Sequence, residues 1–202
     1  MNQFIRWAQI SLLAALFFPS WASADWYVGI GAGRTNNEYL PTFNPAAGES
    51  IDDQDNAFKT FVGLDITPNL AFEVDYANLN SLVVASSPTQ NTEIKAKSVG
   101  LTFVGKAQVH PNAHMFARFG VGRWNSDLTV NGASASGSGT EPVIGLGIAY
   151  RLQNAPLDLR LEWTQYQNVG QGVATTNTRL TGQNVDVLWI GIAYRINLAP
   201  GP

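Results

Sequence analysis

Hydrophobic and polar residues alternate along much of this chain, with a period of two. The segment PLDLRLEWTQYQ, residues 156–167, is one of the clearest examples. Its apolar positions are Leu157, Leu159, Leu161 and Trp163, and the polar positions between them are Asp158, Arg160, Glu162 and Thr164. This period predicts a β-strand with one apolar face and one charged face. The pattern alone does not say which face meets water, because soluble and membrane barrels both alternate.

The same alternation predicts eight strands in all. They fall at residues 26–33, 57–66, 70–79, 99–107, 115–122, 144–151, 156–167 and 187–196. The segments that connect them alternate in length. The short connections are residues 67–69, 110–113 and 153–156, and the long ones are 34–56, 80–92, 125–140 and 167–183. Short turns at one end and long loops at the other are typical of outer-membrane barrels.

The third long connection is expected to be a mobile loop. It contains NGASASGSGT, which is rich in glycine and serine, the composition of a flexible linker.

Glycine is concentrated on the polar faces of the predicted strands, as at Gly29, Gly31, Gly145 and Gly147. The interior of an eight-stranded barrel has room only for a limited volume of side chains. The bulky apolar faces would crowd that interior, whereas the glycine-rich faces leave space for a few long charged chains. We therefore predict an all-β fold, an eight-stranded antiparallel up-and-down transmembrane β-barrel. A soluble exported β-barrel binding protein is the alternative.

This orientation assigns side chains to the lumen and to the membrane. The predicted interior charges are Lys59, Glu73, Asp75, Lys106, Arg118, Arg160 and Glu162. They would either line a narrow ion path or fill the lumen as a plug of paired charges, and the plug is the favoured interpretation. Tyr76, Trp163 and Tyr194 face outward near strand ends, where aromatic rings prefer the membrane interface.

The first 24 residues predict a secretory signal peptide. Arg6 precedes the nine-residue apolar run ISLLAALFF, and Ala22-Ser23-Ala24 resembles a cleavage site. Nine residues are too few for a membrane-spanning helix, which needs about 20. We predict Sec-type export with cleavage after residue 24, a barrel over residues 25–197 and a short tail at 198–202, in the bacterial outer membrane.

Composition removes several function classes. The chain has no cysteine and a net charge of −3, with no basic block, which argues against thiolate metal sites and nucleic acid. His110 and His114 lie in a short turn with no hydroxyl nucleophile beside them, and Pro111 breaks the helical spacing that metal ligands would need. We therefore predict a non-enzymatic protein without cofactor or metal.

The segment ESIDDQDN, residues 49–56, carries Asp52, Asp53 and Asp55. It lacks the glycine and terminal glutamate of an EF-hand loop, so a solvated acidic loop is favoured over a calcium site.

Arg123 lies at the outer end of a strand and faces outward. Such a charge either contacts lipopolysaccharide phosphates or simply extends to water.

Five segments together resemble the transmembrane domain of outer membrane protein A. They are AFEVDYANL (71–79), FARFGVGRWNSD (116–127), EPVIGLGIAYRL (141–152), DLRLEWTQYQNVG (158–170) and WIGIAYRIN (189–197). The resemblance covers seven of the eight predicted strands, and the loops are unlike. It implies an eight-stranded antiparallel barrel that the outer-membrane assembly machinery inserts, with structural, adhesive or weak pore roles.

The family's interior charge lock carries over only in part. Its glutamate on the third strand falls on Glu73 and its arginine on the seventh strand on Arg160. Its lysine on the fourth strand falls on Val104, with Lys106 one inward position further along. Its glutamate on the sixth strand falls on Ala149, so one partner is missing and Glu162 is a candidate substitute.

Full-length members of the family continue into a peptidoglycan-binding domain, which is not recognisable here, so we expect no cell-wall tether. The predicted function is a structural and surface-contact (adhesin-like) barrel with a plugged lumen. A narrow ion or small-solute pore is the alternative. The expected partners are outer-membrane lipids and lipopolysaccharide, the assembly machinery and an unknown surface ligand at the long loops.

Overall fold

The computed structural model describes residues 25–37, 50–52, 55–86, 91–174 and 182–196. The predicted signal peptide and the C-terminal tail at 198–202 lie outside these residues. Within the described residues, no helix has the length and apolar character needed to cross a membrane.

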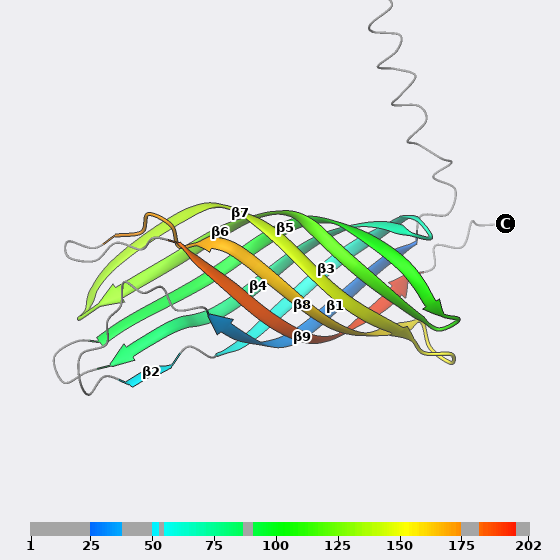
Figure 1. The fold of residues 1–202 in the computed structure, drawn as a ribbon, viewed down its shortest axis with the longest axis horizontal. Coiled ribbons are helices and arrows are strands. Elements are labelled where there is room, and N and C mark those ends of the chain that lie inside the picture. The colour runs from blue at the N-terminus through cyan, green and yellow to red at the C-terminus, as the bar shows by residue number, and fades with distance from the viewer. Residues whose placement is uncertain (1–24, 38–49, 53–54, 87–90, 175–181, 197–202) are drawn as a thin grey trace, which may run out of the picture.

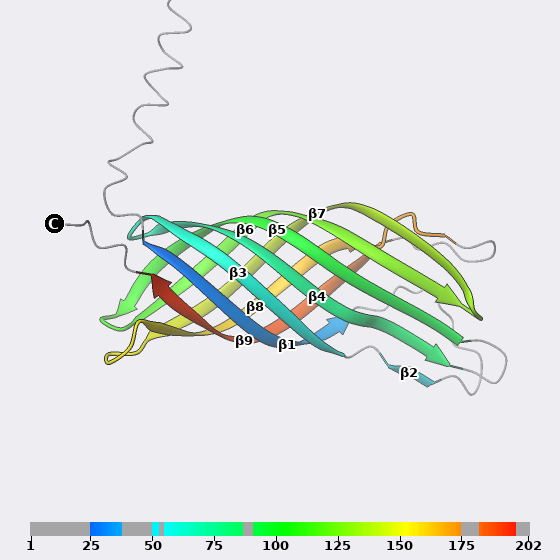
Figure 2. The same cartoon turned by 180° about the vertical axis from the view of Figure 1, so that it is seen from behind.

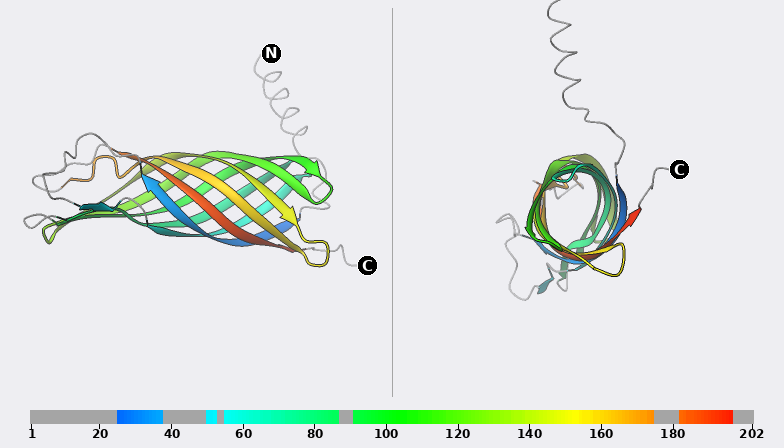
Figure 3. Two further views of the ribbon diagram at one scale, coloured as in Figure 1. Left: turned by 60° about the horizontal axis from the view of Figure 1, so that its bottom comes forward. Right: turned by 90° about the vertical axis from the view of Figure 1, so that its right-hand side faces the viewer.

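The strands are antiparallel and eight of them form one closed ring (Figure 1). The bounds are β1 Trp26–Asn37, β2 Ser50–Asp52, β3 Asn56–Thr67, β4 Leu70–Ser86, β5 Asn91–His110, β6 Ala113–Val130, β7 Ala133–Arg151, β8 Leu157–Val169 and β9 Gln183–Ile196. The order around the ring is β1, β3, β4, β5, β6, β7, β8 and β9, and β9 pairs back to β1. The view along the barrel in Figure 3 shows this ring. The predicted fold class is confirmed.

The first and last strands of the ring lie side by side along their full length (Figure 2). Their pairing runs from Trp26 opposite Ile196 to Asn37 opposite Val185. The β3–β4, β5–β6 and β7–β8 turns lie at the same end as Trp26 and Ile196. In outer-membrane barrels the short turns face the periplasm, so we call this end the periplasmic end and the opposite end the extracellular end.

Three of the predicted long loops contain much more strand than expected. β4 continues to Ser86, β5 begins at Asn91, and residues 125–140 form most of the upper β6–β7 hairpin instead of a mobile loop. A tight turn at Asn131-Gly132, with φ of 49° and 82°, joins those two strands. The first connection also contributes strand, because β1 extends to Asn37 and the short β2 pairs with β4.

The physical reason is cross-strand pairing. Serine, alanine and glycine have little intrinsic strand preference, but each residue from Ala133 to Thr140 has a pairing partner on β6. Strand propensity depends strongly on such context. The prediction of a loop considered only the composition of this segment. Pairing with β6 makes the segment a strand despite that composition.

The two faces of each strand are separated as the lipid-facing orientation requires. Leu159 and Leu161 are 46% and 45% exposed, whereas Arg160 and Glu162 between them are 9% and 2% exposed. The exterior carries a continuous belt of large apolar residues, with Ile190 the most exposed at 70%. Such a belt is far larger than the apolar patches of soluble monomers, and the soluble alternative is therefore set aside.

Glycines make room inside the barrel for aromatic rings as well as for charges, which corrects the expectation that bulky groups stay outside. Five inward glycines each lie directly across from an inward ring on the adjacent strand. The pairs are Gly29–Phe61, Gly63–Tyr27, Gly33–Trp189, Gly147–Phe116 and Gly139–Trp124. A Cβ at Gly33, for example, would lie 2.6 Å from Cε3 of Trp189.

The extracellular half of the lumen is mainly apolar. Trp124, Leu128, Tyr166, Val187 and Trp189 belong to one buried cluster there, which we call the upper apolar plug. Val173, from the chain that follows β8, completes the plug and packs over Gly137 of β7. This end of the barrel is therefore filled mainly by apolar and aromatic side chains.

Candidate functional site

The middle of the lumen holds a compact network of buried charges. Its members are Lys59, Arg118 and Arg160, balanced by Glu73, Asp75 and Glu162, and all six are at most 9% exposed. They come from β3, β4, β6 and β8, so the network ties together strands that are not neighbours in the ring. Buried charges of this kind persist only when they are paired and hydrogen-bonded.

Glu162 is the centre of this network. Its Oε1 accepts hydrogen bonds from Lys59 Nζ at 2.7 Å, Arg118 Nη1 at 2.8 Å and Thr164 Oγ1 at 2.7 Å. Its Oε2 accepts one from Arg160 Nη2 at 3.2 Å. One carboxylate thus contacts all three buried cations.

Two further carboxylates complete the pairing. Glu73 Oε1 lies 2.6 Å from Arg160 Nη1 and accepts a hydrogen bond from the Tyr27 hydroxyl at 2.7 Å. Asp75 pairs with Arg118 Nη2, which also donates to Thr102 Oγ1 at 3.0 Å. Ala149, where the resemblance places a glutamate, is buried and uncharged, and Glu162 on β8 supplies a carboxylate that contacts Lys59 and Arg118.

Arg160 also contacts two aromatic rings inside the lumen. Its guanidinium carbon lies 4.5 Å from the ring centroid of Phe61 and 4.5 Å from that of Phe116. Phe61 belongs to β3 and Phe116 to β6, so the three groups form a stack across the lumen. Cation–π contacts of a desolvated guanidinium contribute about 2 kcal/mol.

One buried carboxyl has no cationic partner among the described residues. Glu141 on β7 is 0% exposed and its hydrogen-bond partner is the Ser98 hydroxyl on β5. It lies in the same row of the wall as Asp75, separated by Gly100 and Gly122. The three cations of the network are already matched by three other carboxylates, so Glu141 stands outside that balance.

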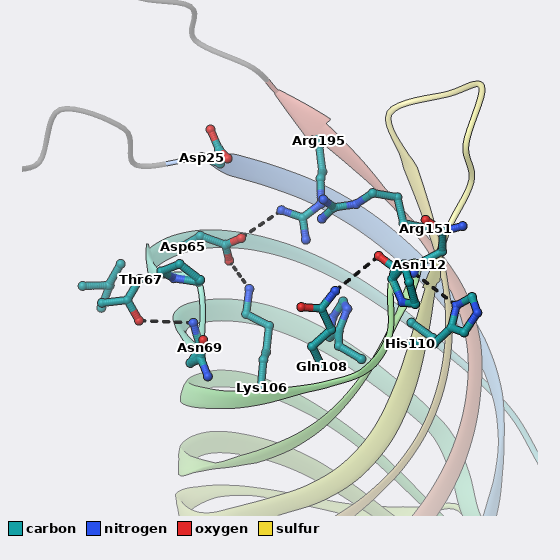
Figure 4. Close-up of a pocket in the computed structure, with 15 residues that line it drawn as sticks. Asp25, Asp65, Thr67, Asn69, Lys106, Gln108, His110, Asn112, Arg151 and Arg195 are labelled. Atoms are coloured by element: carbon teal, nitrogen blue, oxygen red, sulfur yellow. Dashed lines mark hydrogen bonds and ion pairs between the residues drawn. The ribbon is translucent and has the colours of Figure 1, made fainter.

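The periplasmic end of the lumen is an open mouth with a volume of about 430 Å³ (Figure 4). Lys106 lies here and not in the central network, because its Nζ pairs with Asp65 Oδ1 at 2.5 Å. Arg195 bridges Asp65 and Asp158, with both contacts at 2.8 Å, and Arg151 reaches Asp158 at 3.1 Å. The mouth is thus lined by a second, separate chain of ion pairs.

The mouth narrows toward the middle of the lumen. Above it is a void of about 20 Å³ lined by Glu73, Phe116 and Arg160, which is space for roughly one water molecule. The aromatic–guanidinium stack, the central network and the upper apolar plug follow in that order toward the outside.

The structure places the other predicted residues as follows. Tyr76, Trp163 and Tyr194 face outward, with exposures of 39%, 36% and 49%. His110 lies at the mouth, where its Nδ1 accepts a hydrogen bond from the backbone N–H of Asn112, a contact within the turn.

Of the acidic loop, Asp53 lies outside the described residues. Asp55 accepts hydrogen bonds from the backbone N–H groups of Asn56 and Ser81. The described part of the chain contains no group of three or more metal-ligating side chains.

Sequence reasoning missed several lumen residues: Tyr27, Asp65, Glu141, Asp158 and Arg195. Each of them falls at an inward position of the same alternation that identified its neighbours, as Asp158 does beside Arg160. Extending the inward phase to every polar and aromatic residue would have found them. Their partners could not be found in this way.

A closed antiparallel barrel with an apolar exterior, a charged interior and short turns at one end defines the class of outer-membrane β-barrels. The family model of the OmpA-like transmembrane domain matches residues 21–199. The chain therefore belongs to this family, and the resemblance drawn from its motifs is confirmed.

Solved structures show the same fold. Neisserial surface protein A (NspA) is similar with a TM-score of 0.58 and 14% identity, over 85% of this chain and 97% of that one. OprG from Pseudomonas aeruginosa gives 0.56 and 14%, over 87% and 97%. Ail, the attachment invasion locus protein of Yersinia pestis, gives 0.54 and 13%, over 86% and 99%. No curated protein matches the chain significantly.

Proposed function

We propose that this protein is a non-enzymatic barrel with a closed lumen, which supports the outer membrane and presents a surface for contact outside the cell. The observation that carries the proposal is that buried side chains occupy the lumen at three levels. The upper apolar plug, the central network and the Phe61–Arg160–Phe116 stack occupy successive levels above the periplasmic mouth.

The contacts inside the lumen support a structural role over a catalytic one. Three carboxylates of the central network are paired with cations, and Glu141 accepts a hydrogen bond from the Ser98 hydroxyl, which has no histidine partner among the described residues. Acyl-transfer chemistry needs a nucleophile with an adjacent base. The Nδ1 atom of His110 already accepts a hydrogen bond from the backbone N–H of Asn112 in the β5–β6 turn.

The length of the strands supports the surface-contact role. β4, β5, β6 and β7 contain 17, 20, 18 and 19 residues, whereas a tilted strand crosses the membrane with about 9–11. The excess lies at the extracellular end, where these strands project as a curved sheet (Figure 1). Cross-strand pairing gives the side chains of the β6–β7 hairpin a regular arrangement, which is what a contact surface needs.

Planar-bilayer recording of the purified protein tests the closed lumen. We expect no sustained conductance steps, because no level of the lumen above the mouth holds a water path. Reproducible unitary conductance that disappears with the protein would contradict the plug and support the alternative, a narrow ion or small-solute pore. The mouth of about 430 Å³ is the feature that favours this alternative.

Cells that display a shortened β6–β7 hairpin test the surface role. Removing residues 127–136, which pair with one another about the turn, leaves the membrane-crossing part of the barrel in place. We expect normal membrane insertion and reduced adhesion of whole cells to one another or to coated surfaces. Unchanged adhesion by the shortened protein would show that this hairpin is not the contact surface.

A further inference from the structure

The outer wall of β4–β7 has an ordered series of rows, each made of directly paired residues. The two lower rows are apolar: Phe72, Phe103, Phe119 and Ile144, then Val74, Leu101, Val121 and Pro142. Their aromatic members touch, with ring centroids 5.2 Å apart for Phe72–Phe103 and 5.8 Å for Phe103–Phe119. This part of the wall is a continuous apolar surface of the kind that acyl chains cover.

The next two rows toward the outside change character abruptly. They are Tyr76, Val99, Arg123 and Thr140, then Asn78, Lys97, Asn125 and Ser138. Arg123 and Lys97 stand diagonally on adjacent strands, and both are exposed. Diagonal neighbours of this kind are about 7–8 Å apart at the backbone, within reach of long side chains. Two cations therefore share one small area at the upper limit of the apolar wall.

Neither cation is neutralised by a carboxylate in the part of the chain that the structure describes. Among the residues that the structure describes, no carboxylate forms an ion pair with Lys97 or Arg123. The direct partners of Lys97 on both sides are asparagines, and the Arg123 guanidinium has a single weak hydrogen bond, 3.5 Å, to Ser138 Oγ. Like charges held this close repel each other, so the arrangement is stabilised when an anion sits between them.

Lys95, two positions further out on the same face of β5, provides the contrast. Its Nζ pairs with Glu93 at 2.9 Å. The hydrogen bond from Lys95 keeps the pKa of Glu93 below its usual value. Among the described residues, the outer lysine therefore has a carboxylate partner, whereas Lys97 and Arg123 form no ion pair, even though Asp127 lies diagonal to Lys97 on β6.

We propose that the β4–β7 wall binds a phosphorylated glycolipid of the outer leaflet, with its phosphate between Lys97 and Arg123. The acyl chains lie on the apolar rows, and sugar hydroxyls meet Asn78, Asn125 and Ser138. The sequence of apolar surface, cation pair and amide or hydroxyl groups matches the order of parts in such a lipid. A diacyl phospholipid offers a phosphate but no sugar for the row above it.

This inference rests on the orientation within the proposed function, with the short turns in the periplasm, but not on a closed lumen. The two ideas can therefore fail separately. A conducting barrel could still bind the lipid, and a silent barrel could fail to bind it.

Native mass spectrometry of the detergent-purified protein, titrated with bisphosphorylated lipid A, tests the site. We expect a one-to-one complex. Neutralising one cation should weaken it about fivefold and neutralising both roughly 30-fold, as follows from the attraction of a basic residue to an anionic lipid. The variants are Lys97→Gln, Arg123→Gln and the double variant. Lys95→Gln is the matched control, with an affinity within about twofold of the native protein.

The lipid is varied to identify its source. Monophosphorylated lipid A should bind more weakly than the bisphosphorylated form, and phosphatidylglycerol and inorganic phosphate should not displace either at equal concentration. Equal binding by the native protein and the double variant overturns the proposal. Displacement by phosphatidylglycerol at equal concentration also overturns it, because the site would then select charge alone. All variants are first checked for the heat-dependent gel mobility of a folded barrel.

Discussion

At the scale of single residues, the buried carboxylates differ in what they hold in place. Glu162 contacts three cations, whereas Glu141 contacts a serine hydroxyl. Removing one member of a buried charge network leaves its partners uncompensated in a medium of low dielectric, which costs more than the pair itself contributes. The two glutamates therefore offer a matched comparison inside one lumen.

The substitution Glu162→Gln should destabilise the barrel by about 3–5 kcal/mol, because Lys59, Arg118 and Arg160 would then face only two carboxylates. Glu141→Gln keeps a polar group for Ser98 and leaves no cation unpaired, so we expect a change of about 1 kcal/mol or less. Urea unfolding of both variants in lipid vesicles measures the difference. Equal losses of unfolding free energy in the two variants would mean that the ion pairs of Glu162 contribute nothing beyond the burial of its side chain.

Within the wall, the unit of packing is an inward glycine and the ring opposite it. Gly63 lies across from Tyr27, and the Tyr27 hydroxyl is itself bonded to Glu73. A Cβ at Gly63 would overlap the Tyr27 ring, whereas a Cβ at Gly105 would meet nothing within 4 Å. A single methyl group should therefore have opposite consequences at these two glycines.

We expect Gly63→Ala to lower the free energy of unfolding by about 1–3 kcal/mol, the usual effect of overpacking. Gly105→Ala should be neutral or stabilising by up to about 1 kcal/mol, because it restricts the unfolded chain without a clash. Both are measured by the same unfolding experiment. A stable Gly63→Ala barrel would show that the Tyr27 ring moves at little cost.

At the scale of β-strands, the lumen is built in levels that differ in their access to water. The native chain has no cysteine, so single cysteines report that access without interference. His114 on β6 lines both the mouth and the small void, whereas Ala77 on β4 is 0% exposed within the upper apolar plug. A water-soluble maleimide should label His114→Cys in the folded barrel and leave Ala77→Cys unlabelled. Rapid labelling of the cysteine at 77 would show that water enters from the extracellular side.

At the scale of the whole molecule, one orientation determines every other assignment. Leu159 belongs to the outer belt and Arg160 to the lumen. Spin labels attached at these two positions in lipid bilayers should differ, with oxygen dissolved in the membrane relaxing the label at 159 more strongly. Stronger relaxation at 160 would mean that the charged face meets the lipid. That result would contradict the charge network in the lumen, the proposed function and the lipid site together.

The sequence by itself determined the fold class, the closed ring of eight strands and the inward position of every charge that was predicted there. These features follow from a period of two, a local property that each strand carries independently of its neighbours. The residues that the prediction omitted, such as Tyr27 and Arg195, obey the same period.

Only the tertiary structure decided which charges meet. Lys59 and Glu162 are 103 residues apart in sequence and 2.7 Å apart in space, and Lys106 pairs with Asp65 at the mouth instead of joining the central network. Such contacts depend on register and on strand tilt around a closed ring, which accumulate over all eight strands. The conversion of a Gly/Ser-rich segment into the β6–β7 hairpin has the same cause, because its strand partner is fixed by the barrel and not by its own composition.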